Sequence, residues 1–341
     1  MTALHGTPLP VTIVGGYLGA GKTTLVNHLL RHAGGRRLAV LVNDFGDLPI
    51  DADLIEAEDD DIISIAGGCI CCSFGSDLLA ALMTLAERRP APDQVVIEAS
   101  GVALPGSVAR ALTLLTRFVL DGVVVIADAE TVRARAADRY LEDTILRQLT
   151  DADLVILNKI DLAPAAARPV LRAWLAEHAP RAVVVEAVQA AVPIETVLGL
   201  ELRDAAPPAR GLGRLGAHGS RATIAPLQPL AAATEGYVSA RYALPNAFDL
   251  RAFADALVCP ELGVIRAKGV LRDTDGALKV LQVVGRRWTL SAQAPDATLE
   301  CRLVCIGLKA AFDRAAIDRR IQDVAAIDDP SPRANGVNRV E

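Results

Sequence analysis

The chain has 341 residues, a net charge of −6, 52% hydrophobic residues and 22% charged residues. This length predicts two domains, and the composition is that of a globular protein, which excludes a disordered or fibrous chain. An acidic balance without a long basic run argues against nucleic acid as the main partner. The first ten residues lack the features of a secretory signal, and no segment is long and apolar enough to span a membrane. We therefore expect a cytoplasmic protein with no membrane partner.

Apolar runs rich in Val, Ile and Leu alternate with amphipathic stretches from residue 11 to about residue 200. We expect strands at 11–15, 38–43, 94–100, 122–129, 153–159 and 182–187. Helices are expected between most of them, for example at 76–88 and 165–178. Continuous apolar strands separated by helices are typical of a parallel sheet that is covered on both faces.

The second half of the chain changes character. Residues 204–220 are rich in Pro and Gly and show no periodicity, which is typical of a linker. Short strand-like runs and one helical stretch at 250–257 follow, and they predict a small antiparallel α+β unit. The expected division is a first domain at 1–203, a linker at 204–232, a second domain at 233–325 and a disordered tail at 326–341.

The first expected strand runs into GYLGAGKTT, residues 16–24, and then into a helical stretch. The pattern G-x-x-x-x-G-K-T between a strand and a helix is the context of a phosphate-binding loop. Its glycines permit backbone amides to point inward, and the helix dipole adds positive potential. Lys22 is expected to reach the β- and γ-phosphates, and the Thr23 hydroxyl to ligate Mg²⁺. The predicted nucleotide contacts here are Gly16, Gly19, Ala20, Gly21, Lys22, Thr23 and Thr24.

The tetrapeptide NKID, residues 158–161, ends a later expected strand and predicts the base. An aspartate carboxylate accepts hydrogen bonds from N1–H and the exocyclic amine of guanine, a pair of donors that adenine lacks. Asp161 is therefore the expected guanine reader, with Asn158 and Lys159 framing the ring. Alone, the tetrapeptide can also be an ordinary turn. Behind a phosphate-binding loop, it predicts GTP and GDP as the nucleotides.

Two further segments lie where a GTP-binding protein of this class has its switch loops. NDFGD, residues 43–47, brings Asp44 and Asp47 toward the γ-phosphate and Mg²⁺, although Asp47 fits a solvated loop equally well. EASG, residues 98–101, offers Glu98 to hold Mg²⁺ through water and the Gly101 amide to contact the γ-phosphate. The predicted catalytic residues are Lys22, Thr23, Asp44 and Glu98.

The stretch GGCICCSFG, residues 67–75, holds three of the six cysteines: Cys69, Cys71 and Cys72. Three soft thiolates suit Zn²⁺, Cu(I) or another thiophilic ion, but the spacing is not that of a closed structural zinc site. Such a site needs completion by Asp44, by water or by a partner. A tight apolar loop and a redox dithiol are the alternatives.

Six segments together, GGYLGAGKTTLVNHLL, NDFG, GGCICCS, EASGVALP, NKID and RAKG (266–269), resemble the CobW family of P-loop GTPases in order and spacing. These are relatives of the urease and hydrogenase metallochaperones. The resemblance implies an α/β P-loop GTPase domain and a small α+β C-terminal CobW-type domain. It also implies a GTP-dependent metallochaperone that passes a metal to a client metalloprotein. It assigns the three thiols as metal ligands, with Zn²⁺ favoured over Co²⁺, and makes the RAKG module a docking surface.

The chain departs from the family pattern at Asp44 and Asp47, where relatives commonly have Glu, so the shorter carboxylates leave a ligand role open. The linker carries only His218, where many relatives are rich in His. His28 and His32 have the i, i+4 spacing of a helical metal pair but lack a third ligand. Cys301 and Cys305 are expected to be buried in a strand.

The three thiols lie between the two switch segments in sequence. We therefore expect the nucleotide state to set the geometry of the thiols and hence their metal affinity. Hydrolysis without a partner is expected to be slow, on the order of 10⁻⁴ to 10⁻² s⁻¹, because no arginine finger or water-orienting Gln is evident. A client or a homodimer partner could complete the site. The alternatives are a nucleotide-gated metal sensor, a thiol redox switch without delivery, and a small-molecule P-loop kinase.

Overall fold

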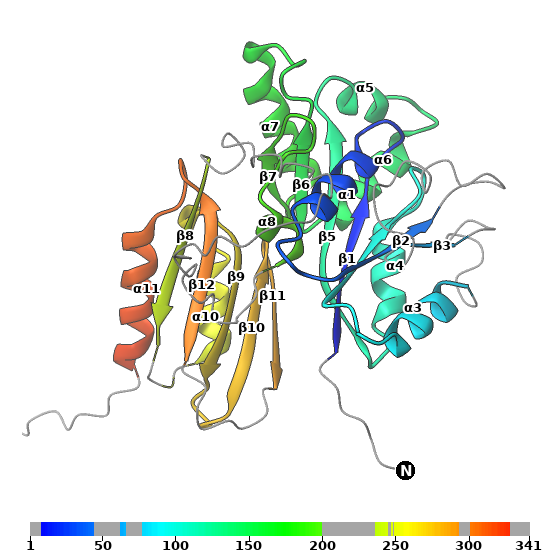
Figure 1. Cartoon of the computed structure of the whole chain (residues 1–341). Coiled ribbons are helices and arrows are strands. Elements are labelled where there is room, and N and C mark those ends of the chain that lie inside the picture. The colour runs from blue at the N-terminus through cyan, green and yellow to red at the C-terminus, as the bar shows by residue number, and fades with distance from the viewer. Residues whose placement is uncertain are drawn as a thin grey trace, which may run out of the picture.

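The computed structural model describes residues 8–43, 62–65, 77–199, 236–244, 247, 249–292 and 301–327. These residues form two sheets (Figure 1). The first is seven-stranded with the order β3-β2-β4-β1-β5-β6-β7, and all its pairings are parallel. Its strands are β1 (Leu9–Gly15), β2 (Leu38–Asn43), β3 (Ile62–Ile65), β4 (Gln94–Glu98), β5 (Phe118–Asp128), β6 (Leu154–Asn158) and β7 (Val183–Glu186).

Helices cover both faces of this sheet, which confirms the expected fold class. One face packs against α3 (Asp77–Glu87), α4 (Pro105–Leu112), α5 (Val132–Ala136), α6 (Glu142–Asp151) and α7 (Arg168–His178). The other face packs against α1 (Lys22–Arg31) and α8 (Ile194–Leu198). β4 and β6 are buried along their whole length, as their continuous apolar sequences predict.

Two details of the first sheet differ from the expectation. β3 was not predicted, because four residues are too short a run to give a periodic signal. The helix expected at 165–178 is divided into a 3₁₀ turn, Ala165–Ala167, and α7, which has a proline in its first turn. Proline is favoured there because a backbone N–H at this position would have no hydrogen-bond partner within the helix, so its absence costs nothing.

The second sheet is five-stranded and antiparallel with the order β11-β10-β9-β12-β8. Its strands are β8 (Tyr237–Ala243), β9 (Val264–Arg272), β10 (Leu278–Val284), β11 (Arg287–Ala292) and β12 (Arg302–Leu308). A 3₁₀ turn, Pro260–Leu262, precedes β9. Two helices, α10 (Leu250–Leu257) and α11 (Arg314–Ile327), share one core with the sheet. The predicted small α+β unit is therefore present. The linker boundaries at 204 and 232 lie outside the described residues and stay predictions.

A buried ion pair joins the two sheets. Leu120 and Gly122 of β5 pair with the adjacent residues Val11 and Thr12 of β1, so Asp121 is an extra residue on β5. A bulge of this kind redirects a side chain. The Asp121 carboxylate accepts a hydrogen bond from Arg266 Nη1 of β9 at 2.9 Å. Arg266, 1% exposed, also donates to the carbonyl oxygens of α8.

The rest of this junction is polar and closely packed. Arg287 donates from Nε to Asp153 Oδ1 at 2.9 Å, and from Nη2 to the Asp121 carbonyl at 2.9 Å. Gly199, at φ +74°, lies so close to the ion pair that an added Cβ would be 3.0 Å from Arg266 Nη1. Figure 1 shows the second sheet beside the first, with β10 and β11 nearest to it. The expectation that RAKG forms a docking surface is wrong for Arg266, which faces inward.

Within the described ranges, none of the helices combines the length and apolar character needed to cross a bilayer.

The junction predicts a large loss of stability on Arg266→Leu. The substitution leaves the Asp121 carboxylate buried without its guanidinium, which costs about 3 to 5 kcal/mol of unfolding free energy. Urea unfolding of the full chain measures it. Arg241→Leu, on the exposed side of β8, is the control and is expected to stay within about 0.5 kcal/mol of the parent. A loss below about 1 kcal/mol for Arg266→Leu would contradict the importance of this pair.

Candidate nucleotide site

The loop between β1 and α1 has the backbone that phosphate binding requires. Gly16 and Gly21 have φ values of +135° and +112°, which only glycine adopts without strain. A Cβ on Gly16 would also collide with the carbonyl oxygen of Ile126. α1 begins at Lys22 with no acidic residue in its first turn, so its N-terminus keeps its positive potential. This end of the helix can therefore hold phosphate oxygens.

Lys22, Thr23 and Glu98 come together beside this loop. Lys22 is only 6% exposed, and Glu98, the last residue of β4, is 1% exposed. The Thr23 hydroxyl donates to Glu98 Oε1 at 3.0 Å, because β4 runs parallel to β1 with Glu98 opposite Val14. A hydroxyl and a carboxylate are the hard oxygen donors that Mg²⁺ binds in phosphate sites. The donor set therefore fits Mg²⁺.

Asn158 connects the phosphate loop to the far side of the site. Its amide nitrogen donates to the Ala20 carbonyl at 2.9 Å, and its amide oxygen accepts from the backbone N–H of Ala190 at 2.8 Å. A Cβ on Gly21 would lie 2.6 Å from Asn158 Nδ2, so the glycine makes room for this amide. Asn158 thus holds the phosphate loop and the loop after β7 together. The Asp161 side chain is exposed and open to a ligand.

The loop after β7 belongs to the site and was not predicted. Gln189 and Ala190 have φ values of +50° and +55°, and two successive non-glycine residues in this region store strain. Strain of this kind often occurs at functional sites. The strand ending at Glu186 was predicted, but the conformation of the loop that follows has no signal in its residues.

Asp128, at the end of β5, positions Lys159. Lys159 Nζ donates to Asp128 Oδ2 at 2.9 Å, and Lys159 itself has a φ of +57°. Burial alone would raise the pKa of Asp128, but hydrogen bonds from Lys159 and from backbone amides outweigh it and lower the pKa. The carboxylate therefore stays ionised and holds the lysine in place. Asp128 was not predicted as a site residue, although its place at the end of an expected strand could have indicated it.

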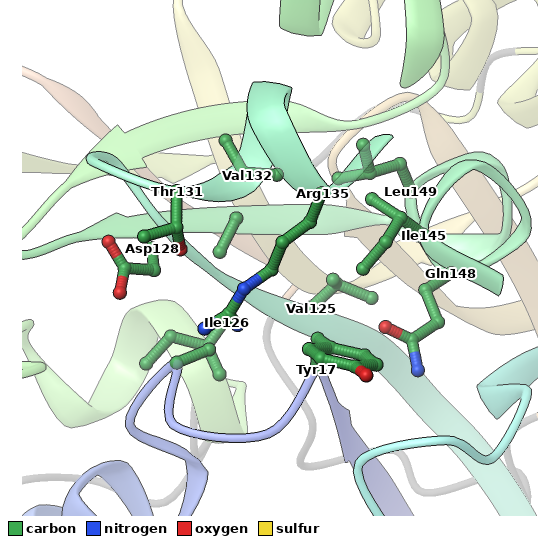
Figure 2. A pocket seen from close by; sticks show the side chains of 12 residues that line it. Tyr17, Val125, Ile126, Asp128, Thr131, Val132, Arg135, Ile145, Gln148 and Leu149 are labelled. Carbon is green, nitrogen blue, oxygen red and sulfur yellow. The ribbon is translucent and has the colours of Figure 1, made fainter. Parts of the chain in front are cut away.

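Behind the phosphate loop lies a cavity of about 20 Å³, enough for one water molecule. Figure 2 shows Arg135 extending from α5 to the loop beside Tyr17, with Gln148 on the opposite wall. Arg135 Nη1 donates to the Leu18 carbonyl at 2.8 Å, and its guanidinium lies 5.0 Å from the centre of the Tyr17 ring. Neither Arg135 nor Gln148 was predicted.

Several predicted site residues lie outside the described residues: Asp44, Asp47, Cys69, Cys71 and Cys72. In the described ranges, no three His, Cys, Asp or Glu side chains gather closely enough to hold a metal ion. Cys305 is buried in β12 as expected, and burial raises its pKa to about 12. Cys301 differs from the expectation, because it precedes β12 and is half-buried.

The rings of His28 in α1 and of His32, the residue that follows α1, have centroids 4.3 Å apart and planes tilted by 37°. His28 Nε2 lies 2.7 Å from the Val192 carbonyl, and His32 Nδ1 lies 2.8 Å from the His28 carbonyl. A ring nitrogen that donates to a carbonyl carries a hydrogen and cannot ligate a metal. Each histidine uses one ring nitrogen in this way, and among the described residues no third ligand gathers with the pair to hold a metal ion.

A parallel sheet with a phosphate loop at the end of β1 and an N-K-x-D sequence at the end of β6 defines a P-loop nucleotide-binding protein. The chain belongs to the family of CobW, HypB and UreG proteins. Residues 10–186 match the model of the "CobW/HypB/UreG, nucleotide-binding domain", and residues 237–325 match the "Cobalamin synthesis protein cobW C-terminal domain". The resemblance to this family that the sequence motifs indicate is confirmed.

Curated relatives include two proteins named "Zinc chaperone CobW". The one from Sinorhizobium is 34% identical over 56% of this chain and 62% of its own, and the one from Pseudomonas aeruginosa is 37% identical over 56% and 60%. The chain thus spans about three-fifths of these relatives' length. The Zn(II)-bound YjiA GTPase from Escherichia coli is 23% identical, with a TM-score of 0.40 over 94% of this chain and 99% of that one.

Asp128→Asn tests the support of Lys159. The neutral amide weakens the hydrogen bond that positions the lysine, and GDP affinity is expected to fall about fivefold, the equivalent of about 1 kcal/mol. Titration with a fluorescent GDP analogue measures it. Arg172→Ala breaks a comparable pair with Glu186 on the surface and is expected to leave affinity unchanged. If Asp128→Asn and the parent bind GDP with equal affinity, Asp128 does not contribute to nucleotide binding.

His28 predicts a dependence of stability on pH. Burial lowers its pKa below 6.5, the Val192 carbonyl opposes this, and His32 and Arg31 add to the lowering. The unfolded chain therefore binds more protons below about pH 6.5, and the folded state loses stability as the pH falls through that value. Between pH 8 and pH 5.5, the midpoint temperature of thermal unfolding should fall less for His28→Gln than for the parent. An equal fall of the midpoint temperature in both proteins would show that His28 does not contribute to the pH dependence of stability.

Proposed function

We propose that this protein is a GTP-binding and GTP-hydrolysing metallochaperone, whose nucleotide state controls the binding of Zn²⁺, or Co²⁺ second, and its transfer to a client metalloprotein. The observation that carries the nucleotide part is the assembly of Lys22, Thr23 and Glu98 at the phosphate end with Asn158 and Lys159 at the base end. The guanine preference rests on Asp161, whose exposed carboxylate is available to the base.

The order of the strands supports a link between nucleotide and metal. β2 pairs in parallel with both β3 and β4, so the carboxyl ends of these three strands lie at the edge of the sheet that carries the phosphate loop. NDFGD continues from β2, the segment with Cys69, Cys71 and Cys72 follows β3, and EASG continues from β4. Because β3 lies outside β2 in the sheet, the segment with the three thiols begins beside the start of NDFGD, at the same edge as the phosphate loop, and it lies between the two switch segments in sequence.

The chemistry assigns separate tasks to the residues. Mg²⁺, held by Thr23 and through water by Glu98, would neutralise charge on the β- and γ-phosphates. Lys22 binds the same phosphates, and the Gly101 amide contacts the γ-phosphate only when it is present. Asp44 stays a proposed accessory residue. Loss of the γ-phosphate releases the switch segments. This changes the geometry of the thiolates that lie between them in sequence, and thereby the metal affinity. Zinc is favoured because thiolates bind it well, and the relatives named zinc chaperones support that choice.

The test is Zn²⁺ and Co²⁺ affinity, measured anaerobically by chelator competition on the full chain with no nucleotide, with GDP and with a non-hydrolysable GTP analogue. Affinity is expected to change about tenfold or more with nucleotide, a coupling of about 1.4 kcal/mol. Cys69→Ser, Cys71→Ser and Cys72→Ser are expected to lower it. The control is Cys259→Ser, a half-buried thiol in the second unit.

Metal affinity that is identical in all three nucleotide states would show that GTP does not control the cargo. Cysteine variants that bind metal as well as the parent would make the loop structural or redox-active. Tight, nucleotide-dependent binding without any transfer to an apo-metalloprotein would favour the nucleotide-gated sensor.

A further inference from the structure

The segment that links β4 to α4 is held from behind by one buried side chain. Gln148 of α6 is 2% exposed, and its amide nitrogen donates to the carbonyl oxygens of Gly101 at 3.0 Å and Ala103 at 2.9 Å. Both N–H groups of one amide are thus used on carbonyls two residues apart. These bonds fix the Gly101–Val102 and Ala103–Leu104 peptide planes.

The same helix anchors the other end of this segment. Asp151, one turn after Gln148, accepts from the backbone N–H of Gly106 at 3.0 Å, at the N-terminus of α4. A Cβ on Gly106 would collide with the Asp151 carboxylate, so the glycine permits this close approach. Residues 101–106 are therefore attached to α6 at both ends.

The front of the segment touches the phosphate loop. A Cβ on Gly101 would lie 2.5 Å from Leu18 Cδ2 and 2.9 Å from the Leu18 backbone nitrogen, so Gly101 is as close to the loop as a residue can be. Leu18 is held on its other side by Arg135 of α5. α5 and α6 contact each other, so residues 132–151 hold both partners of the Leu18–Gly101 contact. Figure 2 shows Arg135 and Gln148 on opposite sides of Tyr17.

We propose that Gln148 is a positioning residue that sets the Gly101 amide at the place of the γ-phosphate, and so determines how strongly the protein prefers a nucleoside triphosphate to a diphosphate. The inference rests on the proposed function. The physical reason is geometric, because an N–H···O bond weakens steeply when donor or acceptor moves by a few tenths of an ångström or turns away. A loop held by two hydrogen bonds and an anchored helix start is preorganised for that bond.

A purely structural glutamine would behave differently. Removing it would lower stability, and it would change the affinities for GTP and GDP by the same factor. The phosphate loop, Lys22 and the base side contact both nucleotides, whereas Gly101 contacts only the third phosphate. The ratio of the two affinities therefore separates positioning from general support.

The experiment compares the full-length parent with Gln148→Leu, which keeps the approximate volume and removes both donors. Dissociation constants for GDP and for a non-hydrolysable GTP analogue are measured with Mg²⁺ by competition with a fluorescent nucleotide. We expect GDP affinity within about twofold of the parent and analogue affinity lower by about tenfold, the size of one hydrogen bond to a charged group. Arg147→Ala, the exposed neighbour on α6, is the matched control and should match the parent for both nucleotides.

An unchanged ratio of the two affinities in folded Gln148→Leu, or an equal loss for both nucleotides, would overturn the proposal. If Gln148→Leu does not fold, as judged by circular dichroism and thermal unfolding, Gln148→Met replaces it, because methionine fills the same space with a more adaptable side chain. The same change in the ratio of the two affinities is then expected of Gln148→Met. Failure of the parent itself to bind either guanine nucleotide would reject the proposed function and this inference together. Normal binding by the parent with an unchanged ratio in the variants would reject the inference alone.

Discussion

The carboxylate of Asp121 is the point on which the arrangement of the two sheets depends. It accepts hydrogen bonds from Thr12 and Gln94 within the first sheet, and from Arg266 and Gln282 of the second. A buried carboxylate is very costly unless donors surround it, and here the donors come from both sheets. The observed orientation of the two sheets brings all of these donors to the carboxylate. The inserted position of Asp121 on β5 and the absent side chain of Gly199 make the space for it.

The segment from Ala187 to Gly199 lies between this junction and the nucleotide site. At one end the backbone N–H of Ala190 donates to the Asn158 side chain, and at the other the carbonyls of Thr196 and Val197 accept hydrogen bonds from Arg266. The second sheet is therefore connected, through this segment, to Asn158 of the site. This explains why Arg266 of the RAKG sequence is buried where a docking surface was expected. Its arginine holds the two units together.

The sequence predicts those parts of the site whose residues are adjacent in a motif, and it misses those that meet from distant segments. Lys22 and Thr23 could be placed because the phosphate loop binds through its own backbone, and Asn158 because NKID ends an apolar strand. Gln148 and Arg135 could not be placed. Gln148 contacts a segment 47 residues away, and Arg135 contacts Leu18 across 117 residues, with no pattern near either residue to indicate it. The short strand β3 was missed for lack of periodicity.

The sequence by itself determined the class of fold, the order of the apolar runs of the parallel strands, the phosphate loop and the N-K-x-D tetrapeptide at the end of β6, because each depends on local chemistry or short-range periodicity. Only the tertiary structure decided how the two sheets face each other, which helix holds the segment after β4, and which carboxylate positions Lys159. Those decisions depend on where donors and acceptors from separate elements meet in the interior. There an unsatisfied polar group costs more than a hydrogen bond contributes, so the complete set of partners selects the packing.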